Sequence, residues 1–301
     1  MRAKIVHLVT RLDLGGAQQN TLHTARTLDR DRFEVVLACG AGGMLDEEVR
    51  RDPLLRTVFF ESLRRNISPF HDLLALLELA RFLFEEKPRI LHTHSSKAGI
   101  LGRLAAALAG VPIVIHTYHG FGFHDRQRTI LRSLSILLEH LCACVTDALV
   151  FVSRANIAYA AAQGLVRPED AVLIRSGVAL AGLPAEVEAG KLKASVGIGM
   201  HKPLVLSVGN LKPQKNAADF VAAAALVLAE IPDARFAFIG DGPQRQALEA
   251  RAFTLGLAGR VVFLGWRRNT AQWLAAADIF MMTSLWEGLP RSLVEAMKSG
   301  L

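Results

Sequence analysis

The chain has 301 residues, of which 51% are hydrophobic, so it can bury the cores of two ordinary domains. Its formal net charge of +7 fits three classes of partner: nucleic acid, an anionic membrane surface or a phosphorylated substrate. The three cysteines, Cys39, Cys142 and Cys144, are too few for a disulfide framework and lack zinc-ligand spacing, which predicts small core residues in a reducing compartment.

Nucleic acid ranks last among these partners. The basic residues are not interleaved with aromatic ones, and the sequence carries no nucleic-acid module signature. The N-terminus runs into a strand-like segment without a signal peptide, and no apolar run reaches about 18 residues. We therefore expect a cytoplasmic protein, with peripheral contact on the inner face of the cell membrane as an option that its charge allows.

The first predicted strand, Ala3 to Val9, leads through a glycine pair, Gly15 and Gly16, into a helix over residues 17–28. Glycines at such a turn let a ligand approach the backbone, and the N-terminus of the following helix favours an anion. A tight turn that needs glycine explains the pair equally well. Further strands are predicted over residues 33–38, 56–60, 89–92, 111–117, 148–152 and 171–174, and helices over 69–86 and 98–109.

A long helix is predicted over residues 126–145. Ile130, Leu134, Leu137, Leu138 and Leu141 line one side of it, and three arginines, Arg126, Arg128 and Arg132, cluster in its first half. A basic amphipathic helix can lie on anionic lipid, but the pattern by itself favours a packed helix with one solvated face. An apolar stripe, Leu73, Leu76, Leu77, Ala80, Leu83 and Phe84, is likewise expected to face the core from the helix over 69–86.

The segment 176–200 is rich in Gly, Ala and Pro and is predicted to be a linker with one short helix. The alternation of strands and helices then restarts. Strands are expected over residues 204–208, 235–239, 261–264 and, as a buried run, 275–282, and helices over 217–230, 244–255, 270–276 and from Pro290 onward.

This pattern predicts an α/β protein of two doubly wound, Rossmann-like domains, residues 1–175 and 201–301, joined by the linker. Ligand sites are expected at the carboxyl ends of the strands, which line one central cleft if the domains face each other. The second domain shows only four strands before the sequence stops. We therefore expect it to be incomplete and the chain to be truncated at its C-terminus, with its last strand left as a hydrophobic edge.

Three loops of the second domain carry polar chemistry. A loop opened by Gly209 contains Asn210 and ends at Lys215, whose ammonium suits a phosphate. Gly240 and Gly242 flank an aspartate after the next strand, Asp241, which can serve its own turn or a ligand. The last loop and helix carry two carboxylates, Glu287 and Glu295, separated by seven residues. Glu295 alone reads as a solvated helix residue; beside the lysine loop, a binding role is favoured.

Together these features resemble glycosyltransferase family 4, the retaining, sugar-nucleotide-dependent enzymes with the GT-B fold. The resemblance covers essentially the whole chain. In the first half it is carried by residues 15–18, 92–99 and 116–121, a set similar to members that build exopolysaccharide, O-antigen or lipopolysaccharide chains. It implies a glycosyltransferase that moves a sugar from a nucleotide-diphosphate sugar to a glycan or lipid-linked acceptor.

The resemblance also implies roles for individual side chains. Glu295 would bind the ribose hydroxyls of the nucleotide, and Glu287 would lie near the donor sugar. Lys215 would neutralise the donor diphosphate. His119 would contact the donor sugar across the cleft, although a local hydrogen bond at a strand end explains a histidine there as well. The other strand-end histidines, His92, His94, His116 and His124, are read as structural.

Five further positions are assigned to the donor site by the same resemblance: Gly15, Gly16, Asn210, Gly240 and Gly242. Family members often carry arginine where this chain has Asn210, which removes one cationic phosphate ligand. The family uses no metal or other cofactor, so protein cations must stabilise the departing diphosphate. A front-face attack by the acceptor hydroxyl, with the phosphate as base, would need no protein nucleophile.

Two other enzyme classes fit the sequence poorly, and two other functions stay open. A glycosidase is disfavoured, because eight steps along the chain at a helical rise put the backbones of Glu287 and Glu295 roughly 12 Å apart, beyond the roughly 5–10 Å that such pairs use. Hydride transfer is disfavoured because no full glycine fingerprint with an acidic partner follows either first strand. A sugar-nucleotide 2-epimerase of the same fold, which would act on the donor alone, and an inactive fragment that only binds nucleotide sugar remain alternatives.

Overall fold

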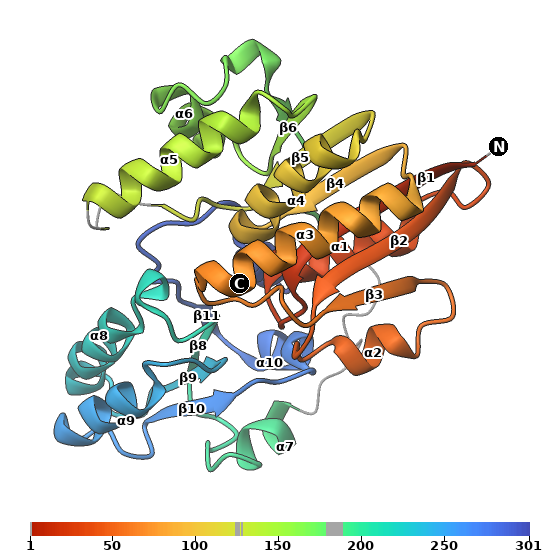
Figure 1. Cartoon of the computed structure of the whole chain (residues 1–301). Coiled ribbons are helices and arrows are strands. Elements are labelled where there is room, and N and C mark those ends of the chain that lie inside the picture. The colour runs from red at the N-terminus through yellow and green to blue at the C-terminus, as the bar shows by residue number, and fades with distance from the viewer. Residues whose placement is uncertain (1, 124–126, 128, 179–188) are drawn as a thin grey trace. The chain divides into compact units, whose positions relative to one another are not determined.

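The computed structural model describes residues 2–123, 127, 129–178 and 189–301 (Figure 1). The chain divides into two compact units, Met1–Ser176 and Gly177–Leu301. Each unit is a parallel sheet with helices on both faces. Three residues that the sequence analysis singled out, His124, Arg126 and Arg128, lie outside the described residues. Much of the predicted linker lies outside them as well.

The sheet of the first unit is a parallel seven-stranded sheet with the order β3-β2-β1-β4-β5-β6-β7. The strand order reverses between β1 and β4, so this sheet is doubly wound, as the alternation predicts. The strands are β1 (Ala3–Arg11), β2 (Phe33–Gly40), β3 (Arg56–Phe60), β4 (Ile90–His94), β5 (Ile113–Tyr118), β6 (Ala148–Phe151) and β7 (Val172–Leu173).

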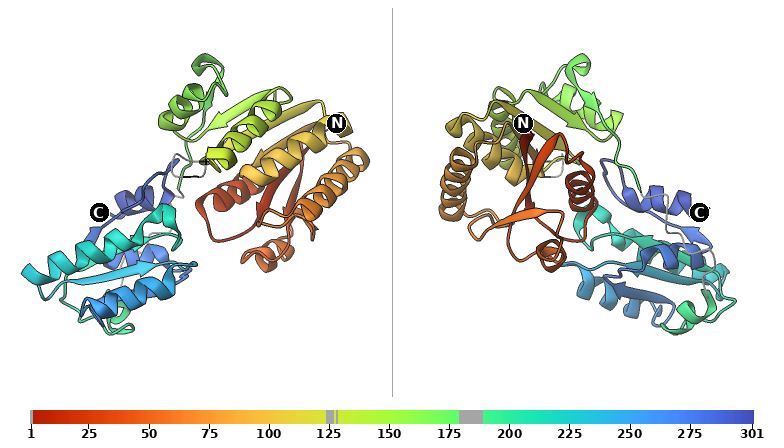
Figure 2. Two further views of the ribbon diagram at one scale, coloured as in Figure 1. Left: turned by 60° about the vertical axis from the view of Figure 1, so that its left-hand side comes forward. Right: turned by 90° about the vertical axis from the view of Figure 1, so that its right-hand side faces the viewer.

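Side chains of β1 alternate between the two faces of this sheet. Ile5 and Val9 pack against Leu22 of helix α1 on one face, and Val6 and Leu8 pack with residues of helices α3 and α4 on the other. Figure 2 shows these helices on opposite faces of the sheet. The helices are α1 (Gly16–Thr27), α2 (Asp46–Arg50), α3 (Pro69–Glu86), α4 (Ser96–Ala109), α5 (Thr129–Ala143) and α6 (Arg154–Ala162). The short helices α2 and α6 were not predicted, because neither shows a long apolar period.

Helix α5 corrects the expectation of a core-facing apolar stripe. Ile130, Leu134, Leu137 and Leu141 are exposed, and the buried residues of the helix are Glu139 and Cys142. Glu139 lies on the inner face because it binds the buried guanidinium of α4 described below, and Ile136 packs into the core from the same helix. Helix α3 deviates in the same way: its buried residues are Ala75, Leu79 and Leu83, whereas Leu73, Leu77 and Phe84 are exposed. Of the stripe predicted there, only Leu83 is fully buried.

The second unit has a four-stranded parallel sheet in its described part, with the order β10-β9-β8-β11. Its strands are β8 (Leu204–Val208), β9 (Arg235–Ile239), β10 (Val261–Gly265) and β11 (Ile279–Phe280). Helices α8 (Ala217–Glu230) and α9 (Arg245–Thr254) supply one core cluster, and α7 (Ala189–Ala194), α10 (Thr270–Ala276) and α11 (Arg291–Lys298) pack into the other.

The last strand is shorter and more exposed than predicted. β11 spans only Ile279 and Phe280, because Ala275 and Ala276 belong to helix α10. Ile279 is 57% exposed, since β11 has β8 on one side and forms the edge of the described sheet. Pro290 stands at the N-cap of α11, one residue before the first helical position at which we expected it. Among the described residues, no helix is long and apolar enough to cross a membrane.

Candidate functional site

The strand order of the second unit reverses between β8 and β11, and in such sheets the crevice at the reversal is where ligands bind. The loops that follow these two strands are joined to each other. The backbone N–H of Leu285 donates to the carbonyl of Gln214 (2.9 Å), and the Gln214 amide donates to the carbonyl of Trp286 (2.9 Å). The Thr283 hydroxyl donates to the carbonyl of Lys215 (3.2 Å). The two loops therefore form one rigid wall.

Lys215 and Glu287 form an ion pair on this wall, with the lysine Nζ donating to Oε1 of the glutamate. Their side chains are 19% and 17% exposed, so the pair is shielded but still reachable. The stem of Lys215 lies across Gly209: a Cβ added at that glycine would stand 3.2 Å from the lysine Cε. Two residues that the sequence assigned to diphosphate and sugar are thus in direct contact.

Gly240 and Gly242 have a structural reason to be glycine. Gly240 has a φ of +134°, and a Cβ there would lie 1.8 Å from the carbonyl oxygen of Gly209. A Cβ on Gly242 would lie 2.6 Å from the carbonyl oxygen of Leu211. Both glycines let the β9 loop approach the β8 loop, and a direct contact with the donor stays a prediction. Asp241 accepts hydrogen bonds from the Gly242 N–H and from Arg245.

Glu295 lies on the fifth residue of α11 and is half-buried. Its Oε1 is 3.7 Å from Nη2 of Arg291, one helical turn earlier. Burial raises the pKa of Glu295, while Arg291 and Lys298 act in the opposite direction. Glu287 and Glu295 therefore each have a cationic partner of their own, Lys215 and Arg291. Asn210 is partly buried on the same loop as Lys215, and its carbonyl accepts from the Lys212 N–H (2.8 Å).

Sequence reasoning missed two side chains next to this wall. Arg291 is 16% exposed, and its Nε is buried with no hydrogen-bond partner among the described residues. The hydroxyl of Ser284 is also buried and has no hydrogen-bond partner among the described residues. Buried donors without partners are rare, and here they suit anionic or hydroxyl-bearing ligand groups. The sequence signal for Arg291 was its place between the two glutamates. It was missed because an arginine at the first position of a helix is usually a surface residue.

The first unit has its own reversal, between β1 and β4, and Gly15 and Gly16 lie at the end of β1. Gly15 is the N-cap of α1, and Gly16 is the first, exposed helical residue. A Cβ on Gly15 would lie 2.4 Å from Oε1 of Gln18, so the missing side chain makes room for that amide. No side chain caps α1, and its first turn holds no acidic residue, so its N–H groups stay available to an anion.

Ser95, just after β4, is a further feature that the sequence did not reveal. Its φ of +66° is unusual for a residue with a Cβ. The strain is held by Thr10 of β1, whose hydroxyl is 2.8 Å from the Ser95 hydroxyl and also accepts from the Ala98 N–H (3.1 Å). Backbone strain that is held in this way clusters at functional sites. The hydroxyls of Thr10 and Ser95 therefore join the ends of β1 and β4 at the reversal.

His119 follows β5, and its Nε2 lies 3.2 Å from Nδ1 of His94. Burial lowers the pKa of His119 to about 4, so its imidazole is neutral at physiological pH. The contact explains the orientation of the ring, which is the local role that we weighed against a ligand contact. His116 fits its structural reading, since it is fully buried and bonded to the Thr93 hydroxyl (2.8 Å). His92 and His94 belong to a larger cluster described below.

Both halves of the chain match known sequence families. The model described as Glycosyl transferase 4-like domain matches residues 15–177, and that described as Glycosyl transferases group 1 matches residues 202–301. A relative from Escherichia coli, a UDP-Gal:alpha-D-GlcNAc-diphosphoundecaprenol alpha-1,3-galactosyltransferase, is 36% identical over 304 residues, which cover 100% of this chain and 78% of the relative.

Solved structures resemble the whole chain. HepE of Anabaena, crystallised with UDP and glucose, superposes with a TM-score of 0.84 at 21% identity, covering 99% of this chain and 79% of HepE. Sucrose-phosphate synthase of Thermosynechococcus elongatus gives a TM-score of 0.80 at 20% identity, with coverages of 98% and 79%. At these identities the likeness shows the fold alone. It confirms the expected GT-B class of two doubly wound domains.

Proposed function

The chain belongs to glycosyltransferase family 4, and from that membership we propose that it transfers a hexosyl group from a uridine-diphosphate sugar to a lipid-linked acceptor during the synthesis of a surface polysaccharide. The uridine base is proposed from two likenesses. The Escherichia coli relative uses UDP-Gal, and HepE was crystallised with UDP-glucose. A lipid-diphosphate acceptor is proposed because the same relative acts on alpha-D-GlcNAc-diphosphoundecaprenol.

The observation that carries the proposal is the ion pair of Lys215 with Glu287 at the β8–β11 reversal. Glu287 holds the ammonium over Gly209, where a diphosphate can reach it. Arg291 is the first residue of the helix that follows the Glu287 loop. Its buried Nε has no hydrogen-bond partner among the described residues, so it adds a second donor near the ion pair. These groups supply a pre-aimed positive charge, which is what a departing diphosphate needs.

In the proposed reaction, the bond between the anomeric carbon and the β-phosphate oxygen breaks, and the diphosphate leaves with the electron pair. The acceptor hydroxyl oxygen forms the new bond on the same face of the sugar, and its proton passes to the departing phosphate. Lys215 stabilises the charge that develops on that phosphate, and Glu295 binds the ribose. No metal takes part in this step, because protein cations supply the charge.

The proposal is tested by thermal shift with a panel of UDP-, GDP- and dTDP-sugars. A UDP-sugar at about 100 times its Kd should stabilise the wild type by about 2.7 kcal/mol, whereas Lys215→Ala and Glu295→Ala should lose most of that shift. Arg251→Ala, on the exposed face of α9, is the matched control and should keep it. Equal stabilisation of all four proteins would remove the site assignment. An epimerised sugar released from donor alone would replace transfer by epimerisation.

We further propose that the first unit meets the membrane that holds the acceptor through helix α5 and the segment 64–70. The exposed stripe of α5 includes Ile130 (81% exposed). Ile67, just before α3, is 85% exposed, and Phe70, in the first turn of α3, is 73% exposed. Helices α3, α4 and α5 pack side by side on one face of the sheet (Figure 1), so their N-termini lie at the same edge. Arg64, in the same segment, is also exposed and suits an anionic headgroup.

Sedimentation with lipid vesicles checks this contact. The wild type should bind vesicles that contain an anionic phospholipid and bind neutral ones weakly, since apolar area and charge act together. The double variant Leu134→Glu, Leu137→Glu should lower binding several-fold, because it places two charges on the stripe. Leu226→Glu changes an equally apolar residue of α8 that is 75% exposed, and it should leave binding unchanged. A similar loss in both variants would contradict the assigned surface.

A further inference from the structure

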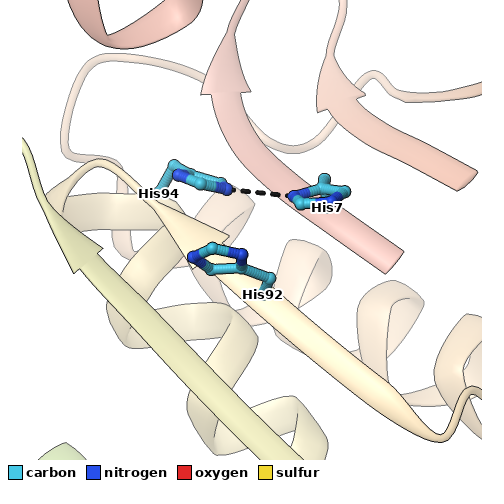
Figure 3. A group of neighbouring side chains, drawn as sticks. All are labelled: His7, His92 and His94. Carbon is cyan, nitrogen blue, oxygen red and sulfur yellow. Dashed lines mark hydrogen bonds between the residues drawn. The ribbon is translucent and has the colours of Figure 1, made fainter. Parts of the chain in front are cut away.

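Three histidines gather inside the first unit, where β1 and β4 lie next to each other (Figure 3). His7 and His92 are register partners in these two strands, and His94 lies two residues beyond His92 on the same face of the sheet. One ring nitrogen from each residue lies within 4.8 Å of those of the other two. We call these residues the three-histidine cluster.

The spacing of the cluster suits a tetrahedral metal ion. Nδ1 of His7 and Nε2 of His94 are 3.2 Å apart. Two imidazole nitrogens that bind one zinc ion at about 2.0–2.1 Å in tetrahedral geometry stand about 3.3 Å apart. The third nitrogen is Nδ1 of His92, because Nε2 of that ring bonds the Thr117 hydroxyl (2.7 Å). His92 is partly exposed, so water can supply a fourth ligand from its side.

The outer contacts of two of the three histidines match those of metal-binding histidines. Such histidines usually donate their second ring N–H to a neighbouring acceptor, which fixes the tautomer and the ring. His94 has this partner in Nε2 of His119 (3.2 Å), and His92 has it in Thr117. In both cases the ring nitrogen that faces the cluster is then left with its lone pair pointing inward.

Without an ion, one printed hydrogen bond joins the ring nitrogens that face the cluster, between Nδ1 of His7 and Nε2 of His94. An ion bound by both nitrogens and by His92 would replace this single contact with three bonds. Nε2 of His7 is the ring nitrogen that the ion would not use, and it is buried with no partner in the described part of the chain.

We propose that His7, His92 and His94 bind one divalent transition-metal ion, with Zn²⁺ as the ion that best suits three imidazoles and a tetrahedral site. The ion would tie β1 to β4 beneath the strand ends. It would also act on His119 through His94: metal at Nε2 of His94 leaves Nδ1–H to donate to Nε2 of His119. His94 is thus a positioning residue for His119, and the ion itself touches neither donor nor diphosphate.

The direct test measures metal in the wild-type chain. Protein stripped with a chelator is titrated with Zn²⁺, and about one equivalent should bind tightly by elemental analysis. Co²⁺ in its place should give the intense visible absorption of a tetrahedral site with nitrogen ligands. Less than a tenth of an equivalent bound, or only the weak absorption of octahedral Co²⁺, would overturn the proposal and leave a hydrogen-bonded histidine cluster.

Variants locate the ion. His92→Gln is the preferred change, because His92 is the partly exposed member and its loss is least damaging to the fold. It should weaken Zn²⁺ binding at least 10-fold and abolish the Co²⁺ spectrum, with circular dichroism unchanged. His23→Gln, on the exposed surface of α1, should bind as the wild type does. Metal lost in His23→Gln but kept in His92→Gln would place the ion at the surface and refute the cluster.

Discussion

Lys215→Met is expected to lower kcat/KM for sugar transfer by about 10²–10³-fold, because it removes a pre-aimed charge from the leaving diphosphate. Methionine keeps an apolar stem over Gly209, so the packing there changes little. Most of the loss should appear in kcat, since the charge on the phosphate grows toward the transition state. Steady-state transfer of radiolabelled sugar from the UDP donor identified by thermal shift measures both constants.

A second effect of the same change must be separated from the first. Removing Lys215 leaves Glu287 without its partner, and a shielded carboxylate without a partner can distort the loop. The double variant Lys215→Met, Glu287→Gln removes that charge. If the diphosphate requires the lysine, the double variant stays at least as impaired as the single one. Recovery of kcat/KM to within about 10-fold of the wild type would show that Lys215 only neutralises Glu287.

The largest stability effect is expected at Glu139, the buried carboxylate on the inner face of α5. Its Oε2 accepts from Nη2 of Arg103 (2.6 Å) and from the hydroxyl of Tyr118 (2.7 Å), and Arg103 is fully buried. Glu139→Ala leaves the guanidinium without its counter-charge, which costs about 3–5 kcal/mol. Urea unfolding followed by circular dichroism should show the loss as a lower midpoint.

Two comparisons make this result specific. Arg103→Met with Glu139→Leu removes both charges, and it should recover most of the loss, because the penalty belongs to the unpaired charge. Glu85→Ala breaks the exposed pair of Arg81 with Glu85 and should change stability by less than about 1 kcal/mol. Tryptophan fluorescence reports on the second unit alone, since all three tryptophans lie there. A midpoint shift confined to fluorescence would contradict the assignment to α5 and α4.

The fold class followed from the sequence to a large extent. Buried parallel strands need continuous apolar runs, and the helices between them need amphipathic ones. Both patterns depend on residues that are close together in the chain, so most strand positions were predicted correctly. The exceptions have local causes. The run 275–282 is divided between α10 and a two-residue edge strand, and α2 and α6 are too short to show a period.

The candidate site was predicted in part. Loops that follow parallel strands carry ligands, so the positions of Lys215, Glu287 and Glu295 could be singled out from their place after strands and from the family resemblance. The partners of these residues could not. Arg291 reads as a surface residue of a helix start, and Ser95 owes its strained backbone to Thr10, which lies 85 residues earlier.

Composition, periodicity and loop position were determined by the sequence alone, because each depends on residues close together in the chain. The contacts that give this protein its chemistry join residues far apart, and only the tertiary structure decided them. Lys215 meets Glu287 across 72 residues, and His7 meets His94 across 87. The orientation of α5 was decided in the same way: the buried charge pair with Arg103 holds Glu139 inward, and the leucines at positions 134, 137 and 141 are exposed.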